Sequence, residues 1–241
     1  MVTGIYRLAE RNIRITSLHD MVHTMCAAYR SEEGCHLDFS VETGQAEIEF
    51  ERSRAERGAG PQQLFSDAYL ETLAVYRQIA EKMPGYDTLL VHCSAVAVDG
   101  EAYLFAALSG TGKSTHVRLW RELLGERAVM VNDDKPLLHV LEDGSAVVYG
   151  TPWDGKHQLS NNISVPVRAI CMLSRGEENR IERISKTEVL PQLLLQVYRT
   201  YDPAAMAKTM ALLDRLNVPF YSLHCNMELS AAELSYTTMK G

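Results

Sequence analysis

The sequence lacks an excess of positive charge and lacks any long apolar run. Its 241 residues include 24 Lys and Arg against 31 Asp and Glu, which gives a formal net charge of −7. Such a chain has no basic field to attract nucleic acid or an anionic membrane, so we expect neither as a partner. No apolar run approaches the ~18 residues of a transmembrane helix, and the start shows no charged-then-apolar leader. We therefore expect no membrane span and no signal peptide.

Paired cysteines are also missing. The chain has five cysteines, an odd number, and no two of them have Cys-x-x-Cys spacing. This usage favours a reduced, cytoplasmic setting. Internal repeats and low-complexity tracts are absent as well. The whole sequence is 46% hydrophobic and 23% charged. This composition is typical of one large globular domain or of a small domain followed by a larger one.

The most informative stretch is a glycine-rich turn, Ser-Gly-Thr-Gly-Lys-Ser-Thr, at residues 109–115. An apolar run precedes it and a helix-forming run follows it, which is the order of a phosphate-binding loop. Glycines let several backbone N–H groups point at one anion, and the helix adds its positive N-terminal end. Ala107 stands where the motif has its first glycine. The residues predicted to bind nucleotide phosphates are Ser109, Gly110, Thr111, Gly112, Lys113, Ser114 and Thr115.

A pair of carboxylates, Asp133 and Asp134, follows a short apolar strand predicted at residues 128–131. Carboxylates placed there can face the open side of a phosphate loop. One can then hold Mg²⁺, directly or through water, while the other accepts a proton from a substrate hydroxyl. Acidic pairs are also common in solvated turns, so the functional interpretation depends on the phosphate loop.

Hydrophobic periodicity predicts an α/β protein. Two strands joined by a tight turn at Asp99-Gly100 lead into the loop, so an antiparallel pair precedes it. Helices are expected after Ser185, Asp202 and Ser230, the first and last with capping boxes. Strands in this part of the chain are expected at residues 88–91, 95–98, 102–106, 128–131, 137–141, 146–149, 167–173, 180–184 and 220–223.

The N-terminal part is predicted to be separate. We expect a hairpin or irregular strand at residues 5–16, a helix at 18–29, strands at 39–41 and 48–50, and a long helix at 64–83. Residues 51–61 are charged, end in Gly and Pro, and lack apolar periodicity, which indicates a linker. The domains would then be a small α/β module at 1–55 and a catalytic domain at 61–241.

Three segments, at residues 91–105, 109–115 and 129–134, together resemble the catalytic domain of HPr kinase/phosphorylase. The loop is also similar to that of ATP-dependent phosphoenolpyruvate carboxykinase. The resemblance implies a P-loop kinase core of the HPr kinase C-terminal-domain type, a mixed sheet with flanking helices. His92 matches the histidine before the loop, and Asp133-Asp134 match the acidic pair. By this match Asp134 is the general base, Ser114 and Asp133 are Mg²⁺ ligands, and Lys113 and His92 are further catalytic residues.

The sequence also differs from that family. Cys93 stands where the family has glycine. The family also has a Glu that binds Mg²⁺ and an Arg-containing signature further along the chain, and we can place neither in this sequence. A loop at 150–162 instead offers Asp154, Lys156 and His157, which we expect to recognise the substrate. Lys156 would neutralise transferred phosphate, and Asp154 would bind Mg²⁺ or a substrate hydroxyl. The alternative is a structural loop with Trp153 packed on the core.

The resulting expectation is an enzyme that uses ATP and Mg²⁺ to phosphorylate a hydroxyl of a small metabolite, with Asp134 as the base. Two alternatives stay open: a serine kinase acting on a peptide or protein, and a sensor that binds ATP without catalysis. The acidic pair argues against a sensor, which needs only one Mg²⁺ ligand. Carboxykinase-like chemistry is a third option, but the chain looks too short for it. The expected partners are a nucleotide and a small-molecule or peptide substrate, with a homo-oligomer as a further option.

Overall fold

The structure is a computed structural model that describes residues 1–58 and 65–241. The chain divides into two compact units, Met1–Lys82 and Met83–Gly241. The sequence predicted a boundary between residues 55 and 61, whereas the units divide after Lys82.

The first unit is a three-stranded sheet packed against helices. β1 (Val2–Leu8) and β2 (Arg11–Ser17) form the expected hairpin, and β3 (Phe39–Glu42) pairs with β2 in parallel. The helices are α1 (Met21–Met25), the short turn η1 (Ala27–Tyr29), α2 (Gln45–Gly58) and α3 (Asp67–Lys82). α3 belongs to this unit because it packs on α1, α2 and β3. Its buried Glu71 accepts hydrogen bonds from the backbone N–H groups of Leu18 and His19, at 2.6 and 2.8 Å.

Two predictions for residues 48–58 are wrong. Residues 48–50 lie in helix α2 rather than in a strand, and residues 51–58 continue that helix rather than forming a linker. Two charges of this run pair with α3: Glu51 accepts from Arg77 at 2.7 Å, and Arg52 forms an ion pair with Asp67. The remainder of the predicted linker, 59–61, and the first residue of the helix predicted at 64–83 lie outside the described residues.

The second unit, all of whose residues are described, is built on a mixed nine-stranded sheet. The strand order is β4-β8-β9-β10-β6-β5-β7, and β12 pairs with both β10 and β11. The long central strand β10 pairs antiparallel with β9 through its first residues and parallel with β6 and β12 through the rest. The strands are β4 (Thr88–Leu90), β5 (Cys93–Val98), β6 (Glu101–Ala106), β7 (Ala128–Asn132), β8 (Leu137–Val140), β9 (Ala146–Tyr149), β10 (Ser164–Arg175), β11 (Arg180–Ile184) and β12 (Phe220–Cys225).

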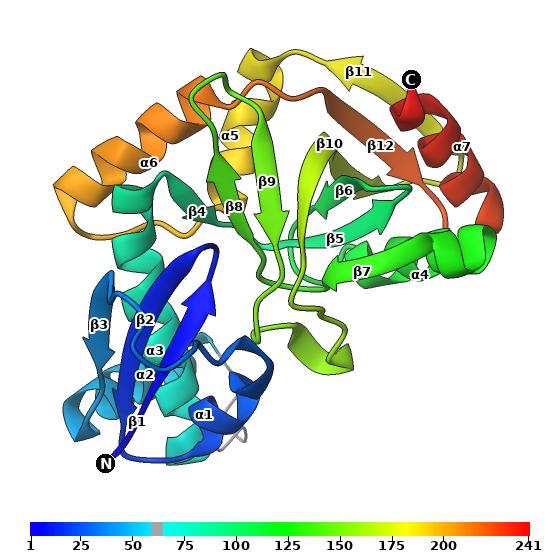
Figure 1. Ribbon diagram of the computed structural model, residues 1–241. Helices are drawn as coiled ribbons and strands as arrows, with labels where there is room; N and C mark the ends of the chain where they lie inside the picture. Colours follow the sequence, from blue (N-terminus) through cyan, green and yellow to red (C-terminus); the bar gives the residue numbers. More distant parts are fainter. Residues whose placement is uncertain (59–64) are drawn as a thin grey trace. The chain divides into compact units, whose positions relative to one another are not determined.

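Helices flank both faces of this sheet (Figure 1). They are α4 (Lys113–Leu124), α5 (Lys186–Gln196), α6 (Pro203–Arg215) and α7 (Leu229–Lys240), with short turns η2 (Met83–Tyr86), η3 (Gly125–Arg127) and η4 (Gly155–His157). Alternate residues of β6 enter two different apolar clusters. Phe105 packs with Trp120 of α4, while Leu104 shares a cluster with Leu193 of α5. β5 and β6 are apolar along almost their whole length because both faces of the sheet are covered there.

The expected α/β fold, a mixed sheet with flanking helices, is confirmed. The hairpin before the loop is β5–β6, and Asp99 and Gly100 have positive φ angles of 53° and 87°, as a tight hairpin turn requires. The capping box at Ser185 is confirmed, but the one at Ser230 is wrong, because α7 begins at Leu229 without a side-chain cap.

None of the helices in the described part of the chain has both the length and the apolar character needed to cross a membrane.

Candidate functional site

Three segments far apart in sequence meet at one end of the sheet because of how β5 is paired. β5 begins at Cys93, opposite Ala106 at the end of β6, and its other neighbour, β7, ends at Asn132 near the same point. Both pairings are antiparallel, so the residue before β5 and the residues after β6 and β7 share one edge. This edge gathers His92, the glycine-rich turn and Asp133-Asp134.

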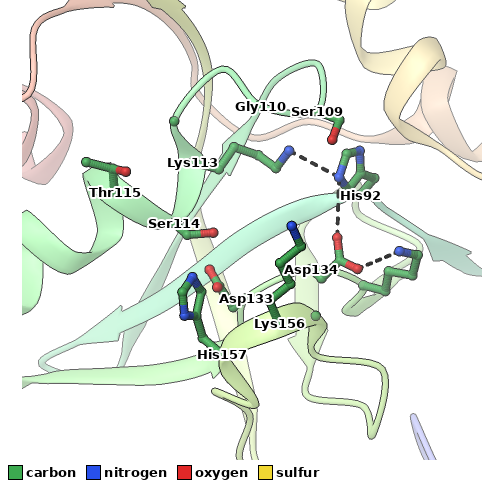
Figure 2. A pocket seen from close by; sticks show the side chains of 13 residues that line it. His92, Ser109, Gly110, Lys113, Ser114, Thr115, Asp133, Asp134, Lys156 and His157 are labelled. Carbon is green, nitrogen blue, oxygen red and sulfur yellow. Dashed lines mark hydrogen bonds and ion pairs between the residues drawn. The ribbon is translucent and has the colours of Figure 1, made fainter. Parts of the chain in front are cut away.

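These segments border a cavity of about 700 Å³ (Figure 2). Its lining residues are His92, Ser109, Gly110, Gly112, Lys113, Ser114, Thr115, Asp133, Asp134, Lys135, Gly155, Lys156 and His157. Most residues predicted to act in catalysis, phosphate binding or metal binding are among them. Thr111 is not: its N–H donates to the Leu108 carbonyl at 3.2 Å, and its own carbonyl accepts from Arg175 at 3.2 Å.

The turn between β6 and α4 borders this cavity. Gly110 and Gly112 have φ angles of 78° and 125°, a region that glycine adopts without strain. α4 begins after Gly112, and no side chain caps it. The first N–H groups of a helix have no acceptor within the helix, and they carry its positive end. Because Lys113, Ser114 and Thr115 line the cavity, this helix start suits an anion.

The Lys113 ammonium is held close to the backbone. Its Nζ donates to the Ala107 carbonyl at 3.0 Å and lies 3.1 Å from Nε2 of His92. The residue is only 7% exposed, and burial lowers the pKa of Lys113. Ala107 replaces the first glycine of the motif, yet the Lys113 contact uses only its backbone oxygen. The side chain of Ala107 packs in the apolar cluster that includes Val117 and Trp120 of α4.

Asp134 lies between a histidine and a lysine. Its Oδ1 is 3.3 Å from Nε2 of His92, and its Oδ2 accepts from Nζ of Lys135 at 2.5 Å. Burial raises the pKa of Asp134, but the His92 hydrogen bond and the Lys135 charge outweigh it and lower the pKa to about 2. The group is therefore a carboxylate at neutral pH. Nε2 of His92 lies close to both Lys113 Nζ and Asp134 Oδ1; it donates to the carboxylate when it carries a proton and accepts from the ammonium when it does not.

Asp133 points the other way, towards Ser114 (Figure 2). It is 6% exposed, and its Oδ1 accepts from the Ser94 hydroxyl at 2.9 Å. Burial raises the pKa of Asp133, while hydrogen bonds from Ser94 and Ser114 oppose that rise. The pair therefore presents one carboxylate to the helix start and the other to His92.

The oxygen donors of Asp133 and Ser114 fit Mg²⁺. This ion keeps several waters and binds through one or two carboxylates together with substrate phosphates. Within residues 1–58 and 65–241, no group of three or more His, Cys, Asp or Glu side chains is arranged to hold a metal alone.

The loop at 150–162 reaches the cavity and is tied to the acidic pair. Asn132 Nδ2 donates to Thr151 Oγ1 at 3.1 Å, and Asn132 Oδ1 accepts from the N–H of Asp134 at 2.8 Å. Gly155 has a φ of 75°, and a Cβ there would lie 3.1 Å from Cβ of Asp134. Lys156 and His157 line the cavity as a result.

Substrate recognition and a structural role were the two interpretations of this loop, and the side chains named for each lie in different positions. Trp153 is buried at 7% exposure, as a structural loop requires, while Lys156 and His157 face the cavity. Asp154 is not among the lining residues, and its Oδ2 accepts from the Ser160 hydroxyl at 2.8 Å.

Sequence reasoning missed four residues that shape the site. Lys135 pairs with Asp134, Ser94 holds Asp133, Asn132 forms the turn, and Arg175 donates to the carbonyls of Gly110 and Thr111. Lys135 and Asn132 directly flank the acidic pair, so their place in the sequence could have indicated a role in the site. Nothing in the sequence around Ser94 or Arg175 indicated such a role, because their contacts depend on strand pairing.

Comparisons with known proteins give two similarities. A family model described as SynChlorMet cassette protein ScmC matches residues 66–197. A solved structure, "Structure of the Hpr(Ser) kinase/phosphatase from Coxiella burnetii", is similar over 63% of this chain and 93% of that chain. The identity is 12% and the TM-score is 0.36. None of the curated proteins compared with this chain matches it.

Proposed function

The chain belongs to the family of SynChlorMet cassette protein ScmC, and we propose that its second unit is an ATP-dependent kinase with a hydroxyl acceptor. One observation carries the proposal. The groups that phosphoryl transfer needs, an anion cradle, a cation, oxygen ligands for Mg²⁺ and a carboxylate base, border a single cavity. These groups are Lys113, Ser114, Asp133 and Asp134, with His92 beside them.

In the proposed reaction the turn at 109–115 binds the triphosphate through its backbone N–H groups, and Lys113 neutralises charge on the β- and γ-phosphates. Ser114 and Asp133 would hold Mg²⁺. When bound, Mg·ATP supplies the γ-phosphoryl group. Lys113 is already buried and directed into the cavity, so little side-chain freedom is lost on binding.

Asp134 accepts the proton of the acceptor hydroxyl. It is a carboxylate at neutral pH, which is the form that can accept a proton. The ion pair with Lys135 fixes one carboxylate oxygen, and His92 orients the other. Lys156 and His157 face the same cavity and would neutralise the transferred phosphate.

The first experiment identifies the acceptor. The purified protein is incubated with Mg·ATP and either a metabolite extract or a peptide pool, and species that gain phosphate are followed by mass spectrometry. We expect a phosphorylated small molecule, and no such product with Lys113→Ala. A phosphorylated peptide instead would show that the acceptor is a peptide or protein rather than a small metabolite. No new phosphorylated species in either pool would favour a non-catalytic sensor of ATP.

The second experiment tests the base. Asp134→Asn keeps the shape of the side chain but cannot accept the proton. We expect kcat to fall by about 10²–10⁴-fold, while the dissociation constant for Mg·ATP changes little. Turnover at the unsubstituted rate in this variant would rule out Asp134 as the base.

A further inference from the structure

A second cavity, of about 220 Å³, adjoins the first. Four residues line both cavities: Ser114, Thr115, Asp133 and His157. The residues that line only the second come from α4, β7 and the loop after η4. They are Val117, Arg118, Arg121, Met130 and Leu159.

The two cavities differ in chemistry. Among the groups assigned above to proton transfer and acceptor binding, His92, Asp134 and Lys156 line only the first cavity, whereas His157 borders both. The second cavity instead combines three apolar side chains with two exposed arginines. Arg118 and Arg121 are three residues apart on α4, so their side chains lie on the same face of the helix. An acceptor hydroxyl placed in the second cavity would not meet Asp134.

The phosphate loop gives a bound triphosphate a direction. In such loops the lysine reaches the β- and γ-phosphates, while the backbone cradles the α- and β-phosphates. Nζ of Lys113 lies beside His92, which borders the first cavity only. Thr115, at the start of α4, borders both cavities. A triphosphate bound in this order would direct its α-phosphate end towards the second cavity.

We infer that the second cavity binds the nucleoside part of the nucleotide, its base and ribose, while the acceptor occupies the first. This inference rests on the proposed function. The flat apolar faces of a base pack against Val117, Met130 and Leu159, and the guanidinium of Arg121 covers the exposed face.

Selectivity among bases is expected to be weak in this arrangement, because only two polar side chains line this cavity alone and two carbonyls of β7 near it are already paired. The Asn161 N–H donates to the Val131 carbonyl at 3.2 Å, and Asn161 Nδ2 donates to the Met130 carbonyl at 2.7 Å. Strong discrimination requires buried polar groups that the wrong ligand leaves unpaired. The polar groups unique to this cavity are two exposed guanidiniums. ATP and GTP are therefore expected to bind with affinities that differ by less than about tenfold.

The test measures dissociation constants of the full chain, with Mg²⁺ present, for ATP, GTP and inorganic triphosphate. The variants are Arg121→Gln, which removes the guanidinium, and Leu159→Trp, which fills the cavity. Lys208→Gln, on the exposed surface of α6, is the matched control for loss of a cation. We expect both cavity variants to weaken ATP binding about tenfold and to change inorganic triphosphate binding less than about twofold. Circular dichroism checks that each variant is folded.

The outcomes separate the two proposals. The nucleoside assignment is overturned if both cavity variants lose as much affinity for inorganic triphosphate as for ATP. It is also overturned if neither variant loses affinity for either ligand. In both cases the kinase proposal stands. If the unsubstituted protein binds neither nucleotide nor inorganic triphosphate, the proposed function itself fails. A preference of more than about a hundredfold for one base would overturn the expected weak selectivity.

Discussion

At the scale of single residues, the protonation state of Asp134 is set by its two neighbours rather than by its burial. Burial would raise the pKa of this carboxyl, yet His92 and Lys135 hold it at about 2. The folded-state pKa is below the ordinary value of 3.8. The contacts of the carboxylate therefore stabilise the fold above about pH 4, and that stabilisation is lost as the pH falls towards 2.

Replacing Lys135 tests this balance. In Lys135→Met the positive charge beside Oδ2 is gone, so the pKa of Asp134 should rise by about one unit or more. NMR titration of the carboxyl carbon measures the shift. Lys156→Met removes a cation from the same cavity without touching the pair, and it should leave the pKa nearly unchanged. Equal shifts in the two variants would mean that general charge in the cavity, not the ion pair, sets the pKa.

His116 is a second residue whose titration is set by its surroundings. Its Nε2 lies 3.0 Å from the Ser235 hydroxyl, which donates to the Ala232 carbonyl and accepts from Trp120. Because the hydroxyl hydrogen is already used, Nε2 of His116 is the donor in this contact. Burial lowers the pKa of His116 to about 4, so the folded protein keeps the ring neutral.

Stability should consequently fall in mild acid. Between about pH 6.5 and pH 4 the unfolded chain binds a proton at His116 that the folded chain does not. This group alone should lower the free energy of unfolding by about 2 kcal/mol between pH 7 and pH 5. Both tryptophans, Trp120 and Trp153, lie in the second unit, so their fluorescence reports its unfolding in urea.

The variant His116→Asn isolates this contribution. The variant loses the titrating ring, so its stability should change about 2 kcal/mol less between pH 7 and pH 5 than that of the unsubstituted protein. An identical pH dependence in both proteins would show that His116 does not carry the effect.

At the scale of secondary-structure elements, two similar sequence patterns give different helix starts. Ser185 and Glu188 form a complete capping box at α5, with the Ser185 N–H donating to Glu188 at 2.8 Å. Ser230 and Glu233 have the same spacing, but α7 already begins at Leu229. The Ser230 hydroxyl accepts from Asn179 at 3.1 Å. α7 thus begins upstream of the residue that local sequence favours, and the Ser230 hydroxyl contacts Asn179 instead of capping the helix.

This difference predicts unequal costs for the same substitution. Ser185→Ala removes an N-cap and should lower the free energy of unfolding by about 1 kcal/mol. Ser230→Ala removes only an exposed hydrogen bond and should cost less than about half as much. Urea unfolding of both variants, followed by tryptophan fluorescence, makes the comparison. A larger loss for Ser230→Ala would contradict the assignment of the caps.

At the scale of the whole molecule, α3 decides where the chain divides. Its residues Leu70, Ala74 and Val75 are fully buried, and the helix packs on α1, α2 and β3 of the first unit. The sequence shows a strong amphipathic pattern here but does not say which unit covers the apolar face. The charged run of α2, which resembled a linker, is part of the same packing, because it pairs with α3.

Two fragments test this division. The fragment 83–241 lacks α3. The fragment 61–241 contains α3 but lacks the elements of the first unit that cover its apolar face. We expect the shorter fragment to remain monodisperse and the longer one to aggregate, since it exposes an apolar helix face. Size-exclusion chromatography with light scattering distinguishes them. A longer fragment that behaves better than the shorter one would place α3 with the second unit.

Sequence alone determined the parts of the site that depend on neighbouring residues. The hairpin turn at Asp99-Gly100 sets Cys93 opposite Ala106. His92 and the glycine-rich turn must therefore lie at the same edge of the sheet. The positive φ of Gly110 and Gly112 and the start of α4 at Lys113 follow from the same local pattern.

Only the tertiary structure decided the rest. The pairing of β7 with β5 brings Asp133 and Asp134 to that edge and places Ser94 under Asp133. The fold of the loop at 150–162 brings Lys156 and His157 into the cavity but turns Asp154 to Ser160. The physical reason is that strand pairing and loop packing join residues distant in sequence, and no local propensity encodes which partner is chosen.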